Sequence, residues 1–120
     1  MYGLKKEIQL GFLTGRELVQ VAIGLYQVRF GFDQDVSISV EAEFRYFDGQ
    51  NEWTWRPEPA SSQIACRTVA LLAASITNVQ SSEEGTLVLT FSNGHRLTVL
   101  DSSKEYESWN ITLPGQTIIV

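Results

Sequence analysis

The most reactive side chains in this sequence are its single histidine, His95, and its single cysteine, Cys66. His95 is a candidate general base or metal ligand, and Asp101 or Glu107 would be the acid that orients its ring. Metal sites normally use several histidine, cysteine or carboxylate ligands, so one histidine with one cysteine makes a poor set. We therefore expect no metal, no cofactor and no catalytic residue, and we expect His95 to lie beside a turn.

Cys66 falls within an expected helix, where two roles are open to it. A thiol near a helix N-terminus can have a lowered pKa and act as a nucleophile. A small cysteine can instead pack a helix against a sheet. The second role is favoured, because the local sequence signatures of catalytic cysteines are missing.

Glu41 and Glu43 are two carboxylates at alternate positions of one expected strand. Such a pair can transfer protons or bind a cation. It can also form a solvated face that discourages edge-to-edge pairing of sheets. The second interpretation is favoured.

Four aromatic side chains on two neighbouring strands are the strongest candidates for a ligand site. They are Phe44, Tyr46, Trp53 and Trp55. If Phe47 pairs with Glu52, these side chains stack across the two strands on one face, and Glu43 meets Arg56 on the other. The four rings then either line an apolar pocket between β layers or form part of the core.

A hairpin pattern occurs twice in the chain, with residues 25–40 lying over residues 84–99 without a gap. A three-residue loop, at 33–35 or 92–94, places the apolar residues of both strands on one face. A two-residue turn at Asn93-Gly94 would divide the second apolar face between two sides. We therefore predict three-residue loops in both hairpins.

Two further strand predictions follow from the alternation of apolar residues. Residues 17–23 form an expected strand that has Val19, Val21 and Ile23 on one side. The second strand of the first hairpin is expected to continue as far as Tyr46, because the alternation does not change.

The predicted fold is α+β and β-rich, with eight or nine mostly antiparallel strands from two similar β-hairpin halves. One main α-helix is expected near residues 62–74, where the apolar residues that follow helical spacing are Ala65, Val69 and Leu72. We expect a single domain, 1–120, with an internal pseudo-repeat at about 17–42 and 75–101.

The composition narrows the functional classes. The chain has 120 residues and a net charge of −5, with 43% hydrophobic and 19% charged residues, which excludes a disordered chain. Acidity argues against a nucleic-acid partner and favours a basic protein or peptide. One cysteine permits no intrachain disulfide, and the sequence begins without a signal-peptide pattern. We expect a cytoplasmic protein that has no membrane span.

The last third of the chain carries the string Gly85 to Gly94 followed by Tyr106-Glu107-Ser108-Trp109. It resembles a family of small uncharacterised bacterial proteins, a domain of unknown function, in which a Phe-x-x-Gly hairpin precedes a C-terminal Tyr-Glu-x-Trp motif. Residues 12–18 also look like the first repeat of that family. The resemblance implies no assigned reaction. Tyr106 and Trp109 either form an exposed anchor pair for a partner or pack the last strand onto the core.

Three functional hypotheses remain. The favoured one is a non-enzymatic protein-interaction domain, immunity- or inhibitor-like by analogy of fold, because the chain is acidic and has no catalytic set. The alternative is a small apolar ligand-binding protein with an aromatic pocket between β layers. The third is an enzyme that uses His95. The sequence leaves the oligomeric state open, and a homodimer is compatible with it.

Overall fold

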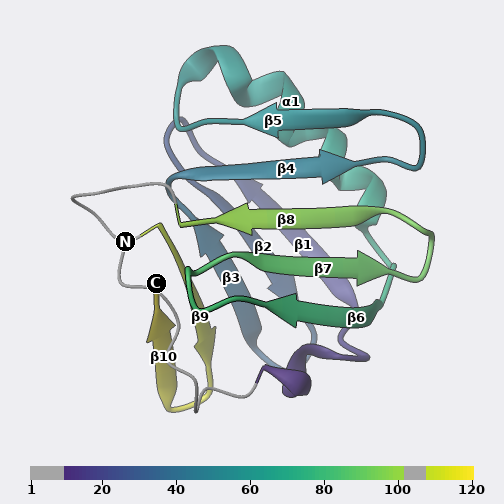
Figure 1. Cartoon of the computed structure of the whole chain (residues 1–120), viewed down its shortest axis with the longest axis vertical. Coiled ribbons are helices and arrows are strands. Elements are labelled where there is room, and N and C mark those ends of the chain that lie inside the picture. Colours follow the sequence, from purple (N-terminus) through teal and green to yellow (C-terminus); the bar gives the residue numbers. More distant parts are fainter. Residues whose placement is uncertain (1–9, 102–107) are drawn as a thin grey trace.

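Residues 10–101 and 108–120, which the computed structural model describes, form ten strands in two antiparallel sheets (Figure 1). The strand order of the first sheet is β1-β2-β3-β9-β10, with bounds of β1 Leu18–Ile23, β2 Val28–Phe32, β3 Val36–Val40, β9 Trp109–Leu113 and β10 Gln116–Ile119. The strand order of the second is β5-β4-β8-β7-β6, with bounds of β5 Glu52–Trp55, β4 Glu43–Phe47, β8 Arg96–Leu100, β7 Leu87–Phe91 and β6 Ile76–Ser81.

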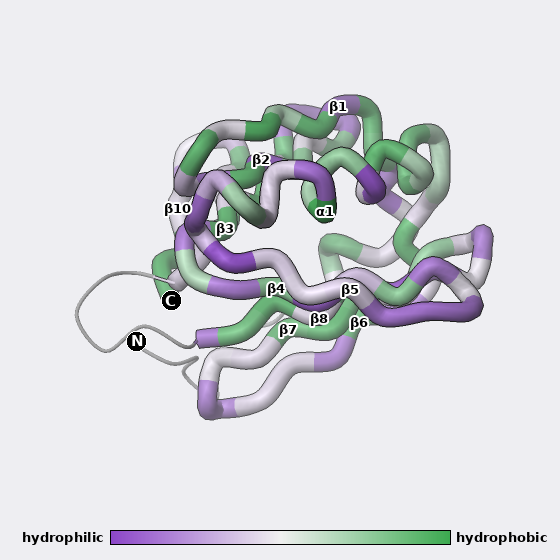
Figure 2. Tube along the Cα trace, turned by 90° about the horizontal axis from the view of Figure 1, so that it is seen from above, coloured by the Kyte–Doolittle hydropathy of each residue, from purple (hydrophilic) through white to green (hydrophobic). Residues whose placement is uncertain are grey.

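The two sheets pack face to face as two layers (Figure 2), and the strands of one run across those of the other. The inward faces meet at Phe30 of β2 and Phe44 of β4, whose rings contact edge to face with centroids 5.5 Å apart. Phe32 and Phe91, one from each predicted hairpin, are only 3% and 2% exposed. The core therefore lies between the sheets, and both hairpins contribute to it.

Both predicted three-residue loops are confirmed. Phe32 pairs with Val36 across the first hairpin. In the second, the backbone N–H of Phe91 donates to the carbonyl of His95 at 2.9 Å. Gly94 has φ +86°, a left-handed conformation that costs glycine little. His95 consequently lies directly after a turn, as predicted.

The expected continuous strand from the first hairpin into the aromatic segment is wrong. β3 ends at Val40, and the chain crosses from one sheet to the other at Glu41 and Ala42 before β4 begins at Glu43. The N–H groups of Glu41 and Ala42 both donate to the carbonyl of Ser108, at 2.9 and 3.2 Å, and thereby fix the bend. This division accounts for the tenth strand and places the two glutamates in different elements.

The predicted pairing of β4 with β5 is confirmed on both faces. Phe47 pairs with Glu52, and the aromatic residues face one another as expected. On the opposite face, Arg56 Nε lies 3.4 Å from Glu43 Oε1. Because the Arg56 side chain is well exposed, this ion pair contributes at most about 1 kcal/mol.

The predicted helix near residues 62–74 is shorter and changes type along its length. α1 spans Ser62–Arg67, and a 3₁₀ helix follows at Thr68–Leu71. Its buried side chains recur every three residues, which is the period of a 3₁₀ helix: Ala65, Thr68 and Leu71. Val69 and Leu72, which follow Ala65 at the spacing of an α-helix, are therefore exposed. No helix in the described part of the chain is long and apolar enough to cross a membrane.

The two sheets share one strand order. In the first sheet, β1 to β3 lie beside the hairpin of β9 and β10. In the second sheet, β6 to β8 lie beside the hairpin of β4 and β5, so each hairpin comes from the other half of the chain. β1 and β6 each have an irregularity after the first residue and the same burial pattern: one buried residue, two exposed, one half-buried and two exposed. A β-bridge between Glu17 and Ser75 links the starts of β1 and β6. An internal repeat would produce this arrangement, although the repeat itself stays a prediction.

Candidate functional site

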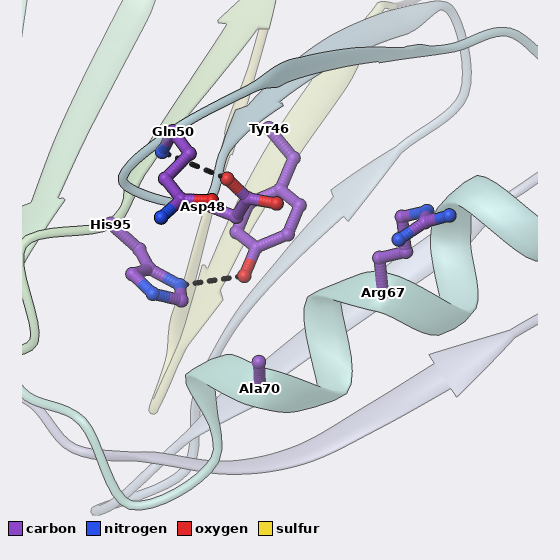
Figure 3. A pocket seen from close by; sticks show the side chains of 6 residues that line it. All are labelled: Tyr46, Asp48, Gln50, Arg67, Ala70 and His95. Carbon is purple, nitrogen blue, oxygen red and sulfur yellow. Dashed lines mark hydrogen bonds between the residues drawn. The ribbon is translucent and has the colours of Figure 1, made fainter.

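An open cavity of about 350 Å³ lies where two turns of the second sheet meet the helical segment (Figure 3). The residues that line it are Tyr46, Asp48, Gln50, Arg67, Ala70 and His95. β4 and the turn after it supply the first three, the helical segment supplies Arg67 and Ala70, and the turn before β8 supplies His95. The antiparallel pairing of β4 with β8 brings Tyr46 and His95 together.

A short hydrogen bond joins two of these side chains, with 2.6 Å between Tyr46 Oη and His95 Nδ1. Burial, and then the nearby charge of Asp48, raise the pKa of the Tyr46 phenol. The phenol therefore stays protonated, and when it donates this hydrogen bond the acceptor is Nδ1 of His95. The ring then carries its proton on Nε2, where it can donate a further hydrogen bond.

Asp48 is a fixed negative charge at the cavity. Its Oδ1 accepts hydrogen bonds from the backbone N–H groups of Asn51 and Gln50 at 2.8 and 3.0 Å, and its Oδ2 accepts one from Trp53 Nε1 at 3.2 Å. These hydrogen bonds, led by the one from Asn51, lower the pKa of Asp48 to about 2. The carboxylate is thus ionised at neutral pH and closes the turn between β4 and β5.

Arg67 supplies a positive charge to the same cavity. Its Cζ lies 3.8 Å from the ring centroid of Trp53, in a cation–π contact. Within the described part of the chain, its guanidinium makes no hydrogen bond or ion pair. Its N–H donors are therefore available to a ligand.

The structure places three of the four aromatic candidates in the core. Phe44 and Trp55 are fully buried and stacked, with centroids 5.2 Å apart, and Tyr46 is 1% exposed. Trp53 is half-buried beneath Arg67. Only Tyr46 lines the cavity, through its polar end. The apolar ligand between the layers stays a prediction, because the cavity described above meets these four residues only at Tyr46.

The other candidates are dispersed. Trp109 is fully buried and donates from Nε1 to the carbonyl of Gly85 at 2.8 Å, so it packs the last strands onto the core. Tyr106 lies outside the described residues, as does Glu107. Asp101 follows β8 at the end opposite to His95 and accepts a hydrogen bond from Ser108 Oγ.

Cys66 lies at the surface of the helical segment. Cys66 was expected to pack against the sheet, but it is exposed near the end of α1. The cause is the register of the short helix, in which the neighbouring Ala65 takes the buried position. Across residues 10–101 and 108–120, no group of three or more histidine, cysteine or carboxylate side chains is arranged to hold a metal ion.

Sequence reasoning missed Arg67, Asp48 and Gln50 as neighbours of His95. The Asp-Gly-Gln-Asn string marks a turn, and a turn signal alone does not indicate a binding residue. The pairing of β4 with β8 joins strands that are far apart in the sequence, and no local periodicity encodes it.

A second surface consists of apolar side chains along β1 and the turn after it, which we call the apolar edge. Its members are Val19, Ile23, Leu25 and Tyr26, which are 53%, 37%, 59% and 60% exposed. The expected common face of 17–23 is wrong at its start, because the irregularity after Leu18 takes Val19 out of alternation. Apart from Leu18, whose N–H and carbonyl are hydrogen-bonded to Ala74 and Ala73, β1 has no paired strand on its outer side in the described structure.

The corresponding edge at β6 is polar. Thr77 and Ser81 stand where β1 has Val19 and Ile23, given the shared burial pattern. The turn after β6 carries Glu83 and Glu84, both exposed, where the turn after β1 carries large apolar side chains. β1 and β6 thus have the same burial pattern, although the exposed side chains are apolar only at β1.

A model of a protein family described as a family of unknown function (DUF6188) matches residues 11–120. The matched span includes both sheets, the cavity and the apolar edge. Searches of the curated proteins and of the solved structures found no match.

Proposed function

Because the chain belongs to this family of unknown function, its role must be argued from its own surfaces, and we propose that it is a non-catalytic protein-interaction domain. The apolar edge is the surface through which it would bind its partner. Four large apolar side chains are exposed within residues 19–26, and such exposure on a small domain is typical of an interaction site. The lone cysteine fits our proposal that the protein acts in a reducing cytoplasm.

One observation carries the proposal, namely the contrast between β1 and β6. Folding does not require apolar side chains at these edge positions, since β6 has the same burial pattern with Thr77 and Ser81. The apolar residues of β1 therefore serve something other than the core. Leu25 and Tyr26 extend this surface at the tip of the turn, which the Gly24 N–H closes by donating to the Gln27 carbonyl at 2.8 Å.

The charge of the chain suggests the character of the partner. A net charge of −5 attracts a basic protein surface and speeds its association. An acidic domain that covers a basic surface is a reasonable design for an inhibitor, and we propose an immunity- or inhibitor-like role on this ground. The separation of His95 from Asp101 at opposite ends of β8 supports a role without catalysis.

Site-specific photo-cross-linking tests this proposal. A photo-reactive aromatic amino acid replaces Tyr26 in the native host, and the matched control carries it at Glu84, which is exposed in the equivalent turn. We expect a discrete adduct of one partner, identified by mass spectrometry, at position 26 only. Adducts at both positions with the same proteins would contradict the proposal.

The identified partner is then purified and titrated against an edge variant. Val19→Thr, Ile23→Ser and Leu25→Glu together give β1 the residue types found at β6. We expect Kd to rise at least about tenfold while the melting temperature changes little. A control variant with Thr77→Ser and Ser81→Thr should leave Kd unchanged. Equal affinity of the edge variant and the unmodified chain would refute the proposal.

A further inference from the structure

We propose that the cavity beside Arg67 binds a small organic acid that also carries a hydrogen-bond donor, such as a hydroxy acid or an amino acid. Arg67 and His95 would hold the carboxylate, and Asp48 would accept from the donor. The proposal is independent of the apolar edge, because none of its residues lies on β1 or the turn after it.

Arg67 is the primary anchor for the carboxylate. The cation–π contact with Trp53, 3.8 Å from Cζ to the ring centroid, holds the guanidinium beside the cavity without using its N–H donors in a hydrogen bond within the described part of the chain. A guanidinium with free donors matches the two oxygens of a carboxylate in a bidentate pair. Because Trp53 also donates to Asp48, the arginine platform and the acidic wall of the cavity are held by one ring.

His95 adds a second donor that is oriented in advance. The hydrogen bond with Tyr46 occupies Nδ1 and leaves Nε2 as the ring nitrogen that can donate to a ligand. Tyr46 is almost fully buried in β4, so this arrangement is anchored to the core rather than to a loop.

Asp48 determines which acids fit. Its three hydrogen bonds keep it ionised, and a doubly charged phosphate would meet this negative charge as well as the positive charge of Arg67. A ligand with one carboxylate next to a hydroxyl or amino group can pair with Arg67 and also donate a hydrogen bond to Asp48. A volume of about 350 Å³ limits the occupant to a small molecule, and the small side chain of Ala70 leaves this space open.

Nuclear magnetic resonance provides a direct test, because the chain contains only one histidine and its ring signals are unambiguous. The probes are glycolate, acetate, ethanolamine and inorganic phosphate. We expect glycolate to shift the His95 ring and Trp53 indole signals saturably with Kd of about 10 mM or tighter. Acetate should bind more weakly, and ethanolamine and phosphate should give no saturable shift.

Two matched variants assign the effect to the cavity. Arg67→Gln should weaken glycolate binding at least about tenfold. Arg56→Gln, which removes an exposed arginine that pairs with Glu43 outside the cavity, should leave it unchanged. The proposal is overturned if no probe gives a saturable shift, if phosphate binds more tightly than glycolate, or if the two variants weaken glycolate binding equally.

Discussion

Asp48 couples the stability of one turn to pH. Its three hydrogen bonds are made by the carboxylate, and its pKa in the folded chain is lowered to about 2. A group whose folded pKa is below its unfolded value stabilises the fold above the unfolded pKa. That contribution is lost as the pH falls through the folded pKa, so the affected range for Asp48 runs from about pH 4 to about pH 2.

Substitution Asp48→Asn should therefore remove a pH-dependent part of the stability. Asparagine keeps an oxygen that accepts from the Gln50 and Asn51 N–H groups but loses the charge. We expect the unmodified chain to melt at a higher temperature than the variant at pH 6, and the difference to shrink steadily towards pH 2. Thermal unfolding at several pH values measures it, and Glu52→Gln on the same hairpin is the control. A difference that does not depend on pH would contradict the explanation.

The residues of the cavity show where sequence reasoning about single side chains stops. His95 was correctly placed after a turn, because the parity of the second hairpin fixes its position. Its hydrogen bond to Tyr46 was not foreseen, since it depends on β4 lying beside β8 in space. The cation–π contact of Arg67 with Trp53 likewise joins a helix and a strand through packing alone.

At the level of elements, Gly85 in the turn after β6 lies against Asp101, which follows β8, and Val120, which follows β10. A Cβ on Gly85 would lie 2.6 Å from Asp101 Cβ and 2.9 Å from Val120 Cγ1, and its φ is +97°. Its carbonyl also accepts the hydrogen bond from the buried Trp109 indole. The glycine therefore permits both the backbone conformation and the contact.

Comparison of two glycine substitutions separates these effects. Gly94→Ala, at φ +86° with no atom within 4 Å of a new Cβ, should lose about 1–2 kcal/mol from backbone strain alone. Gly85→Ala adds a clash with packed atoms and should lose at least about 1 kcal/mol more. Denaturant unfolding measures both values. An equal loss for the two variants would mean that the close approach adds nothing.

The hairpins were predictable because only one loop length places the alternating apolar residues of both strands on the same face. One register satisfied both faces of β4 and β5, and the structure has that register. The division between β3 and β4 was not predictable, because the apolar alternation runs unbroken through Ala42 although the chain changes sheets there. The end of α1 was missed because a switch from a period of 3.6 to a period of three residues leaves a similar apolar pattern.

At the level of the whole molecule, each sheet is completed by strands from the other half of the chain. The hairpin of β4 and β5 pairs with β8, and the hairpin of β9 and β10 pairs with β3. Neither half therefore contains a complete sheet. The two halves should unfold as one cooperative unit.

Dividing the chain tests this interdependence. We expect fragments 1–58 and 59–120 each to lack a cooperative thermal transition, because two strands of each fragment, β3 and β4 or β8 and β9, would lose one of their two neighbours. Mixed together, they should recover a cooperative transition by circular dichroism, with the intact chain as the reference. A cooperative transition in either fragment alone would show that one half is self-sufficient.

The polar side chains along β6 also limit how copies of this protein can assemble. If both edges, β1 and β6, were apolar, each molecule could bind a neighbour at each edge. Head-to-tail association of this kind grows into open fibres. With only one apolar edge, association through that edge stops at a dimer. Thr77, Ser81 and the glutamates after them would thus deny a second apolar contact surface to another copy.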